Sequence, residues 1–359
     1  MKAGIIGYLQ SGKTTLFNIL TRAGAQIGYS GKGESNIGVA KVPDPRLWTL
    51  SEMFRPKKTT PATVEYLDLP GVAKGEFQTA TQSGSLRNSD ALVHVVRAFE
   101  DPHNPHPEGS VDPPRDIANF ELEMIFSDLA TIENRLERLG KDLKKAKTSE
   151  LEAENTLLQE FKKYLEDERP LREIEVTAEL SKRIRGFAFL SLKPQIIILN
   201  LGEADVGEID SAVGKFHLDD WVRRPQLGFS AVCGKIEGEI AELSENDAQA
   251  FLKDLGFAEP GLNRVIRDTY RIMNLISFFT VGEDEVRAWT IQRHTPAQKA
   301  AGEIHSDIER GFIRAEVVSY ENLVAGGSLT AAKEKGLLRL EGKDYIVEDG
   351  DVINFRFNV

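Results

Sequence analysis

The stretch Gly7–Thr15, with the sequence GYLQSGKTT, constrains the fold of this chain more than any other. It fits the pattern G-x-x-x-x-G-K-[ST]. The apolar run Ala3–Ile6 precedes it, and Leu16, Ile19 and Leu20 follow it at helical spacing. The predicted order is therefore strand, glycine-rich loop and helix, which is the context that this pattern requires. Because the backbone N–H groups of such a loop and the positive end of the following helix bind phosphate, the stretch predicts a nucleotide phosphate site.

Two residues of this loop carry the expected chemistry. We expect the Lys13 ammonium to reach the β- and γ-phosphates and to stabilise the transferred phosphoryl group, and the Thr14 hydroxyl to bind Mg²⁺. The other loop residues of the predicted phosphate site are Gly7, Gln10, Ser11, Gly12 and Thr15. A glycine turn before a surface helix is the plain alternative, and the strand and helix that flank the loop disfavour it.

A second motif of the same kind of site follows the strand predicted over 63–67. The sequence Asp68-Leu-Pro-Gly71 fits the pattern D-x-x-G. P-loop nucleotide hydrolases hold their second Mg²⁺ contact at such a turn. We expect Asp68 to act on the metal through water and the Gly71 N–H to meet the γ-phosphate. The turn is common by itself, so its weight comes from its place after the phosphate loop.

The base of the nucleotide is expected at the end of a later strand. The apolar run 195–199 predicts a buried strand, which ends in the sequence NLGE that begins at Asn200. GTPases use Asn-Lys-x-Asp here, whose Asp accepts from guanine, whereas this chain has Leu201 and Glu203. An Asn amide can instead pair with adenine N6 and N7, so the motif is weak for guanine and compatible with adenine. Backbone contacts to the base are expected from two residues of the next strand and loop, Ser230 and Ala231.

Composition sets the class of protein. The chain has 359 residues, 41% hydrophobic and 28% charged, which suits a globular protein of two or three domains. No apolar run reaches the ~20 residues of a membrane span, no secretory signal opens the chain, and Cys233 is the only cysteine. We therefore expect a cytoplasmic protein without membrane contact. The net charge of −11 disfavours nucleic-acid binding over the whole surface but leaves room for one basic face. The basic runs 182–185 and 264–267 are candidates for such a face, although short runs of this kind are more often solvated helix faces.

The middle of the chain predicts a helical hairpin. Beyond the strand predicted over 91–99, apolar residues are spaced alternately by three and four: Leu122, Ile125, Leu129, Ile132, Leu136, Leu139 and Leu143. Such heptads are typical of a coiled coil. A partner helix then carries apolar residues on one face: Leu151, Leu158, Phe161 and Leu165. Two complementary helices in one chain favour an antiparallel hairpin over a coiled-coil dimer, so we expect a monomer. His94, within 91–99, is expected in the core.

The last part of the chain predicts a small α+β module over 275–359. The runs 275–281 and 285–289 predict a β-hairpin, and 344–355 predicts two further strands joined by an Asp-Gly turn. A helix that carries Val265 and Tyr270 is expected to connect this module to the part before it.

Together these motifs resemble the YchF / Obg-like ATPase family over essentially the whole chain. The resemblance is carried by the phosphate loop, the D-x-x-G turn, the helical hairpin and five short runs: Pro43–Leu47, His94–Glu100, Lys193-Pro194, Asn200–Glu203 and Asp349–Phe355. The last run is highly typical of the TGS domain of that family. The resemblance implies an α/β P-loop NTPase G domain of the Obg type, with an inserted antiparallel coiled-coil helical hairpin and a C-terminal α+β TGS domain. The implied bounds are 1–115 with 186–258 for the G domain, 116–185 for the hairpin, 259–274 for a connecting helix and 275–359 for the TGS domain.

The resemblance also implies a function. It implies ATP preferred over GTP, Mg²⁺ as cofactor, and association with ribosomes during translation, with RNA as a further partner of the TGS domain and the cleft beside it. Members of the family carry a hydrophobic residue where Ras-like proteins place the water-positioning Gln, and here that residue is Val72. A loop histidine is the substitute, and His106 stands at its position.

The chain departs from the family at the phosphate loop and at both switches. The family usually has Pro and Asn where this chain has Leu9 and Gln10. Lys32 stands where the family has a Thr that binds Mg²⁺, and the Gly-rich second switch is replaced by the sequence GEFQTA at 75–80. We therefore predict a divergent member in which nucleotide binding is better preserved than switching.

Three functions remain open from the sequence. The first is a slow Mg²⁺-dependent ATPase whose affinity for a ribosomal partner changes with the nucleotide that the ATPase has bound, with His106 as the residue that orients water. The second is a nucleotide-gated ribosome or RNA binding protein with negligible hydrolysis, which Lys32 and Val72 favour. The third is a GTP-binding protein that hydrolyses GTP.

Overall fold

The structure is a computed structural model, and it describes residues 1–22, 36–69, 75, 84 and 86–358. The chain divides into two compact units, which are 1–38 with 65–272 and 39–64 with 273–359. We find no candidate membrane-spanning helix among the described residues.

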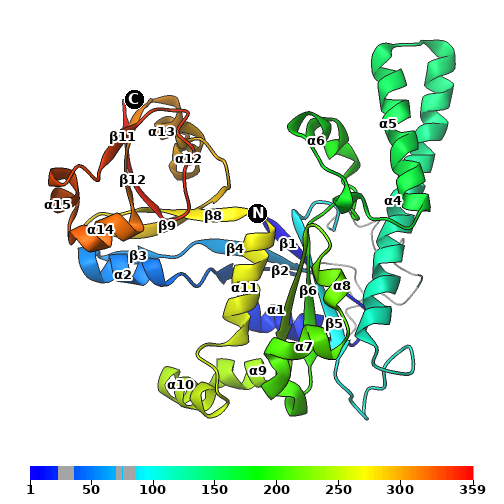
Figure 1. Ribbon diagram of the computed structural model, residues 1–359, viewed down its shortest axis with the longest axis horizontal. Coiled ribbons are helices and arrows are strands. Elements are labelled where there is room, and N and C mark those ends of the chain that lie inside the picture. The colour runs from blue at the N-terminus through cyan, green and yellow to red at the C-terminus, as the bar shows by residue number, and fades with distance from the viewer. Residues whose placement is uncertain (23–35, 70–74, 76–83, 85, 359) are drawn as a thin grey trace. The chain divides into compact units, whose positions relative to one another are not determined.

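A six-stranded sheet forms the centre of the first unit, in the order β2-β4-β1-β5-β6-β7 (Figure 1). The strands are β1 (Lys2–Ile6), β2 (Asn36–Lys41), β4 (Thr63–Asp68), β5 (Ala91–Ala98), β6 (Gln195–Leu201) and β7 (Leu227–Val232). From β4 to β7, neighbouring strands pair in parallel. Every residue of β5 and β6 is buried, as expected for parallel strands that helices cover on both faces. The strands predicted from these apolar runs are confirmed, and His94 is a core residue with 1% exposure.

The register of the parallel strands brings the predicted motifs to one edge of the sheet. Ile5 of β1 lies opposite both Asp68 of β4 and Val93 of β5, and Asn200 of β6 lies opposite Val232 of β7. The segments that follow β1, β4 and β6 therefore leave the sheet at the same carboxyl-terminal edge. Open α/β sheets bind their ligands at this edge.

Helices of the first unit pack on both faces of the sheet. α11 (Gly261–Ile272) contacts β5, β6 and β7, and α4 (Pro113–Lys145) contacts β5 from the other side (Figure 1). α1 (Lys13–Thr21) follows the predicted phosphate loop and packs against β1 and α9 (Gly234–Glu242). The shorter helices are η1 (Leu171–Glu173), α6 (Ala178–Ile184), η2 (Arg185–Phe187), η3 (Glu203–Ser211), α7 (Ala212–Lys215), α8 (Asp219–Val222) and α10 (Glu245–Asp254).

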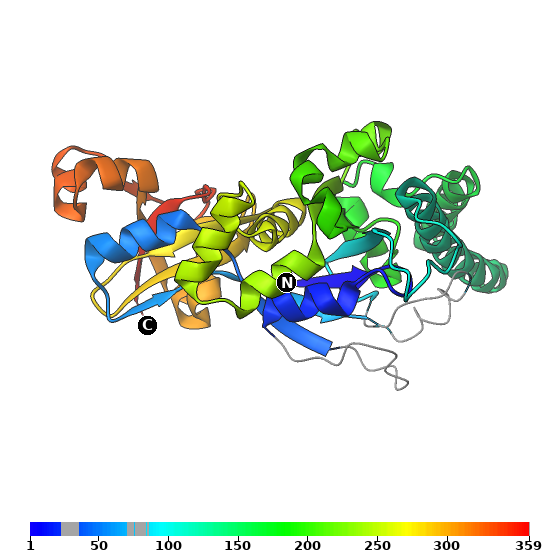
Figure 2. The ribbon, with the colours of Figure 1, turned by 90° about the horizontal axis from the view of Figure 1, so that it is seen from below.

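α4 and α5 (Ser149–Glu166) lie side by side in opposite directions, and we call this helix pair the helical arm (Figures 1 and 2). α4 has 33 residues, so at 1.5 Å per residue it is about 50 Å long. Its apolar residues Ile125, Ile132 and Leu139, spaced by heptads, belong to one buried cluster with Leu158 and Phe161 of α5. Burial of this shared seam holds the two helices together, since most helical stability in proteins comes from the packing of an amphipathic face.

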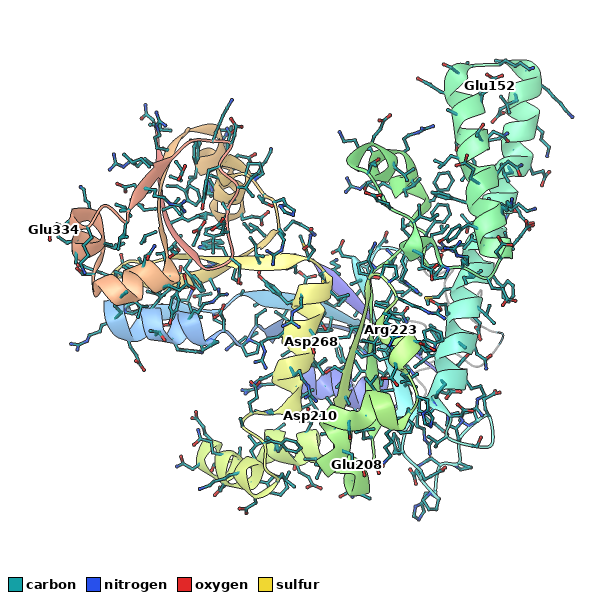
Figure 3. All side chains as sticks on the ribbon, in the orientation of Figure 1. Glu152, Glu208, Asp210, Arg223, Asp268 and Glu334 are labelled. Atoms are coloured by element: carbon teal, nitrogen blue, oxygen red, sulfur yellow. The ribbon has the colours of Figure 1, made fainter. Side chains whose placement is uncertain are left out.

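Local hydrogen bonds fix where the arm helices begin. Asp112 caps α4 and Thr148 caps α5, and the side-chain oxygen of each accepts a backbone N–H. Arg135 of α4 donates twice to Glu154 of α5, at 2.8 Å each. Glu152, in the first turn of α5, lies at the end of the arm that is far from the sheet (Figure 3).

A buried polar network fastens the base of the arm to β6. Arg172, 1% exposed, pairs with Glu121 of α4 and donates to Gln195 Oε1 at 2.8 Å. Asp128 of α4 accepts from the two successive backbone N–H groups of 190–191, at 2.9 and 2.7 Å. Because buried charges are tolerated only when they are paired and hydrogen-bonded, these contacts hold the base of α4 in one position.

The second unit has its own six-stranded sheet, in the order β11-β10-β12-β8-β9-β3. The strands are β3 (Lys58–Thr60), β8 (Leu275–Thr280), β9 (Glu285–Gln292), β10 (Phe312–Ser319), β11 (Arg339–Glu341) and β12 (Asp351–Phe357). The helices are α2 (Pro45–Phe54), α12 (Ala297–Ile304), α13 (Ser306–Arg310), α14 (Tyr320–Gly326) and α15 (Leu329–Glu334). β8 and β9 form the predicted antiparallel hairpin, with Phe279 opposite Ala288.

Residues 39–64 belong to this second unit, although the sequence motifs placed them in the nucleotide domain. Arg46, in the first turn of α2, pairs with Asp44 at 2.8 Å and with Asp349 at 2.9 Å, and its guanidinium lies over the Phe279 ring. β3 extends the sheet parallel to β9. These contacts join segments that are far apart in sequence, so patterns read along the chain do not reveal them.

The prediction of two strands over 344–355 is wrong in its first half. β12 begins at Asp351, and the described residues 344–350 contain no regular strand. The Asp351 carboxylate accepts the Glu348 N–H at 2.9 Å, and the Asp349 carboxylate accepts the Ser277 N–H at 2.9 Å. Side-chain oxygens thus take backbone hydrogen bonds that a strand partner would otherwise make.

Candidate nucleotide-binding site

The loop between β1 and α1 has the backbone form that a phosphate loop requires. Gly7 has φ of 143° and Gly12 has φ of 92°, values that favour glycine. A Cβ at Gly7 would lie 2.3 Å from the Val95 carbonyl oxygen, and a Cβ at Gly12 would lie 2.3 Å from Asn200 Nδ2. Conformation and space therefore both require these glycines. α1 begins directly after Gly12, so the N–H groups of its first turn can bind an anion.

Lys13 is held inside this loop. It is 5% exposed, and its Nζ donates to the Tyr8 carbonyl oxygen at 2.5 Å. Burial lowers the pKa of Lys13 to about 8, and the negative charge of Asp68 opposes this shift. A buried ammonium is stabilised by added negative charge, so a triphosphate in the loop would complete its environment.

Asp68 and Thr14, the two predicted metal ligands, lie together. Asp68 is 6% exposed, and the Thr14 and Asn36 side chains lie near enough to its carboxylate to lower its pKa by hydrogen bonding. Burial raises the pKa of Asp68, while these two hydrogen bonds and the charge of Lys13 lower it. Oδ1 of Asp68 is buried and has no hydrogen-bond partner among the residues that the structure describes. This donor set fits Mg²⁺, which takes oxygen ligands and commonly uses one or two carboxylates together with substrate phosphates.

Asn200 joins the phosphate loop to the segment after β7. It is 7% exposed, its Nδ2 donates to the Ser11 carbonyl oxygen at 3.0 Å, and its Oδ1 accepts the Gly234 N–H at 3.0 Å. The predicted pairing with adenine N6 and N7 needs the same Oδ1 and an amide N–H. In this structure the Asn200 side chain therefore braces two loops of the site.

Glu203 pairs with a lysine that the sequence patterns did not single out. Lys235 Nζ lies 2.6 Å from Glu203 Oε2, and both side chains are at least half exposed. Glu203 begins η3 and Lys235 lies in α9, so the pair spans the same two segments that follow β6 and β7. A carboxylate that already accepts from an ammonium has less capacity to accept from guanine N1–H and its amino group.

Several residues that were predicted to contact the nucleotide are buried in the structure. Leu201, Ser230 and Ala231 are buried, at 2%, 7% and 5% exposure, and the Ala231 carbonyl oxygen accepts from Arg264 at 2.8 Å. Leu201 and Ala231 belong to an apolar core cluster. Three further predicted positions lie outside the described residues, namely Lys32, Gly71 and Val72.

The remaining loop residues differ in exposure. Ser11 is buried at 2% exposure, whereas Thr15, in the first turn of α1, is half-buried. Gln10 is exposed and has φ of 61°, the left-handed region in which side chains other than Gly, Asn and Asp are uncommon.

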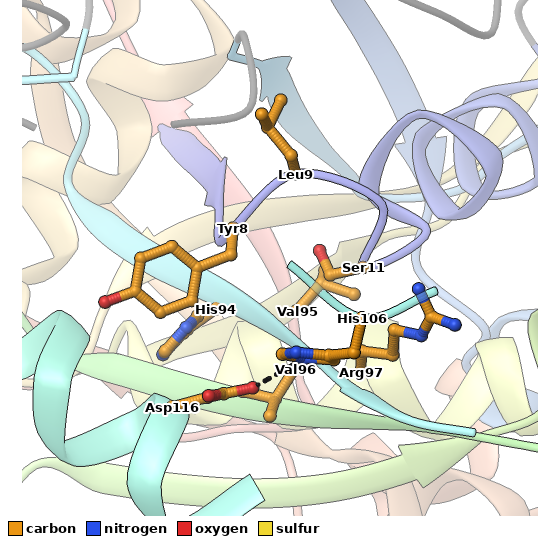
Figure 4. Close-up of a pocket in the computed structure, with 9 residues that line it drawn as sticks. All are labelled: Tyr8, Leu9, Ser11, His94, Val95, Val96, Arg97, His106 and Asp116. Atoms are coloured by element: carbon orange, nitrogen blue, oxygen red, sulfur yellow. Dashed lines mark ion pairs between the residues drawn. The ribbon is translucent and has the colours of Figure 1, made fainter. Parts of the chain in front are cut away.

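His106 lies next to the phosphate loop, in a small pocket between that loop, β5 and α4 (Figure 4). It is 7% exposed, and its Nε2 lies 3.0 Å from Asp116 Oδ2. Its Nδ1 accepts the Glu108 N–H at 3.2 Å. Both ring nitrogens are therefore occupied by protein groups. Burial raises the pKa of the Asp116 carboxyl, and Arg115 and His106 oppose this effect.

Sequence reasoning missed the contact between α4 and the phosphate loop. The Tyr8 ring packs edge-on against Phe120 of α4, with 5.3 Å between centroids, and its hydroxyl donates to Glu123 Oε1 at 3.2 Å. The same Glu123 oxygen accepts the Gly75 N–H at 3.2 Å. Tyr8 and Glu123 are 115 positions apart, so no local motif links them.

Two family models match the chain. One, described as "50S ribosome-binding GTPase", matches residues 2–200. The other, YchF-GTPase_C, described as "Protein of unknown function (DUF933)", matches residues 275–358. The first model covers the strands and loops of the candidate site, and the second covers the C-terminal strands.

Full-length relatives also match. The chain is 42% identical over 365 residues to the "Ribosome-binding ATPase YchF" of Bacillus subtilis, with 100% of both chains covered. It is 40% identical over 367 residues to the protein of that name in Escherichia coli O157:H7, covering 100% of this chain and 99% of the relative. Among solved structures, the Schizosaccharomyces pombe YchF GTPase aligns with a TM-score of 0.85 at 30% identity, over 99% of this chain and 97% of that one. The two bacterial relatives are thus named ATPases and the Schizosaccharomyces pombe protein a GTPase.

Proposed function

This chain belongs to the YchF family, and from that premise we propose that it is a Mg²⁺-dependent P-loop hydrolase that prefers ATP to GTP and associates with the ribosome. The observation that carries the proposal is the pair of buried, incompletely compensated groups at the phosphate loop. Lys13 is a buried cation, and Asp68 Oδ1 is a buried oxygen without a partner among the described residues. A magnesium triphosphate would satisfy both at once, because its phosphates would neutralise the ammonium and its metal would take the carboxylate.

We assign roles to the residues at the site from this geometry. Lys13 and the loop N–H groups would stabilise the transferred phosphoryl group, and Thr14 and Asp68 would hold Mg²⁺, which neutralises charge on the β- and γ-oxygens. Gly71 would meet the γ-phosphate. Hydrolysis needs little from the protein beyond these contacts to the phosphates and metal and the orientation of a water molecule. His106 is the residue that we propose orients this water.

The preference for ATP rests on the segment after β6. Leu201 is buried where GTPases place a lysine, and Glu203 is paired with Lys235 at 2.6 Å. Neither arrangement favours the two donors of guanine. The bacterial relatives are named ATPases, which supports the same choice.

Family membership also supports a domain assignment. We infer an Obg-type G domain from 1–115 and 186–258, an inserted coiled-coil hairpin from 116–185, a connecting helix from 259–274 and a TGS domain from 275–359. The contacts of β3 and Arg46 within the second unit extend the last domain by part of 39–64. We propose that the protein acts as a cytoplasmic monomer that binds the ribosome. RNA contacts are proposed through the TGS domain and the cleft beside it.

A second function is favoured by one observation. Both nitrogens of His106 are hydrogen-bonded within the protein, so the residue proposed to orient water cannot do so in this arrangement. A nucleotide-gated ribosome-binding protein with very slow turnover would have such a site. GTP as the principal nucleotide is the further alternative, which the name of the Schizosaccharomyces pombe relative supports.

Nucleotide titration followed by single-turnover hydrolysis tests these functions. We expect Mg²⁺-dependent binding of ATP tighter than that of GTP, loss of both in Lys13→Ala, and hydrolysis that ribosomes stimulate and that His106→Ala removes. Tighter GTP binding would overturn the adenine assignment. Hydrolysis that neither ribosomes nor His106→Ala change would support the second function.

A further inference from the structure

His106 is held in one tautomer and one orientation by its two neighbours. The Glu108 N–H donates to Nδ1 at 3.2 Å, so Nδ1 must be an unprotonated acceptor. The ring proton then lies on Nε2, which donates it to Asp116 Oδ2 at 3.0 Å. Figure 4 shows this pair below the phosphate loop, with the imidazole directed at the carboxylate.

Asp116 is itself fixed on its other side. Arg115 donates to Oδ1 through Nε at 3.0 Å and through Nη2 at 2.9 Å. The same guanidinium donates to the Ser110 carbonyl oxygen at 2.8 Å. Arg115 thus balances the charge of the buried carboxylate, and Oδ2 stays available to accept from His106 Nε2.

Asp116 lies on the helix that forms the arm. Asp116, Phe120 and Glu123 are spaced by four and three residues, so they share one face of α4. Phe120 and Glu123 contact Tyr8 of the phosphate loop, and Glu123 also accepts the Gly75 N–H. One helical face therefore touches the His106 loop and the phosphate loop together, and the same helix continues into the heptads of the arm.

We propose that Asp116 is a positioning residue that holds His106 in a resting arrangement, and that this hydrogen bond must open before His106 can orient water. The proposal rests on the hydrolytic function proposed above and adds a regulatory step to it. Opening needs only a displacement of the first turns of α4 relative to the loop that carries His106. The arm is in this way connected to the rate of hydrolysis rather than to nucleotide binding.

We call the hydrogen bond between Asp116 and His106 the latch, and Asp116→Asn in the full chain tests it. Asparagine keeps the side-chain volume but has one oxygen acceptor in place of two, for which Arg115 and His106 then compete. The hydrogen bond to Nε2 also loses its ionic component, which is worth roughly a factor of five in the equilibrium. We expect kcat for ATP in single turnover to rise about five-fold, with KM and nucleotide affinity unchanged. In the His106→Ala background the same substitution should change nothing. The matched control is Asp142→Asn, which alters another aspartate of α4 at the far end of the helix from His106 and should leave kcat unchanged.

A fall in kcat for Asp116→Asn, or an equal change in the His106→Ala background, would overturn the latch while leaving the hydrolytic function intact. Absence of binding and hydrolysis of ATP and GTP by the unchanged protein would overturn the function and the latch together.

A spectroscopic measurement examines the resting arrangement without activity. In ¹⁵N NMR of the nucleotide-free chain, the ring that disappears in His106→Gln should show the Nε2–H tautomer, and Asp116→Asn should shift its signals. A wild-type His106 ring with the proton on Nδ1, or one that Asp116→Asn does not affect, would refute the arrangement.

Discussion

Asn200→Ala separates the two roles that the sequence and the structure give to this residue. In the structure its side chain makes two buried hydrogen bonds of 3.0 Å, to the Ser11 carbonyl oxygen and from the Gly234 N–H. Ser11 and Gly234 are both buried, so water cannot easily replace the lost partner. Leaving a buried backbone group unpaired costs about 1 to 3 kcal/mol. For two such groups we expect the free energy of unfolding of the nucleotide-free protein to fall by about 2 to 6 kcal/mol.

Urea unfolding without nucleotide measures this loss directly. Asn200→Asp should lose at least as much, since its carboxylate can still accept the Gly234 N–H but places a buried charge and an acceptor oxygen against the Ser11 carbonyl oxygen. The control is Asn246→Ala on α10, an exposed asparagine, for which we expect a change within about 0.5 kcal/mol. If Asn200→Ala keeps full stability while it abolishes the ATP preference, the brace is refuted and direct contact with adenine is the better explanation.

Four further outcomes follow from the structure. Lys13→Met should abolish nucleotide binding in a fluorescence titration and yet raise the urea midpoint of the nucleotide-free protein. The reason is that burial penalises the charged form of Lys13, as its lowered pKa of about 8 indicates. A lower midpoint would contradict this. Leu201→Lys with Glu203→Asp should shift the ratio of ATP to GTP affinity toward GTP, and an unchanged ratio would mean that the base is recognised elsewhere. Gln10→Asn should stabilise the protein by roughly 0.5 to 1 kcal/mol, because asparagine tolerates the left-handed conformation at φ 61° better than glutamine does. Differential scanning calorimetry checks this, with Gln159→Asn at an exposed position of α5 as the control. Arg356 and Asn354 hold the pKa of Glu316 below its usual value of 4.5. The stability gained from the ion pair of Glu316 with Arg356 is therefore present above pH 4.5 and is lost as the pH falls through the lower pKa of Glu316 in the folded state. Glu316→Gln should reduce the unfolding midpoint at pH 7 and have progressively less effect in acid.

The parts of the fold that local physics dictates could be predicted from the sequence. The continuous apolar runs of β5 and β6 predict strands buried on both faces, and the heptads at Ile125, Ile132 and Leu139 predict the seam on which α5 packs. The glycines at 7 and 12 predict the phosphate loop, because their φ values and the lack of space for a Cβ are consequences of that loop. In each case the relevant information lies within a few residues of the element itself.

What could not be predicted depends on contacts between distant segments. The segment 39–64 joins the second unit through the pairing of β3 with β9 and through Arg46 with Asp349, 303 positions away. The ion pair of Lys235 with Glu203 could not be predicted, because the two residues are 32 positions apart and no motif includes both. The role of Asn200 was assigned from its residue type and place in a motif, but its hydrogen-bond partners are set by how two loops meet, which a motif does not contain.

We expect the departures of this chain from its family at Leu9 and Gln10 to affect binding and turnover differently. Phosphate binding depends on the backbone of the loop and on the buried Lys13, so the side chains of Leu9 and Gln10 contribute little to it beyond the conformational strain at Gln10. In the function proposed above, turnover depends on the release of a ring nitrogen of His106, and Asp116 in the first turns of α4 holds Nε2. Because the phosphate loop and this latch are different sets of atoms, affinity for nucleotide can be preserved while the rate of hydrolysis changes. Under the proposed latch, the helical arm is the element through which a bound partner could alter the rate of hydrolysis.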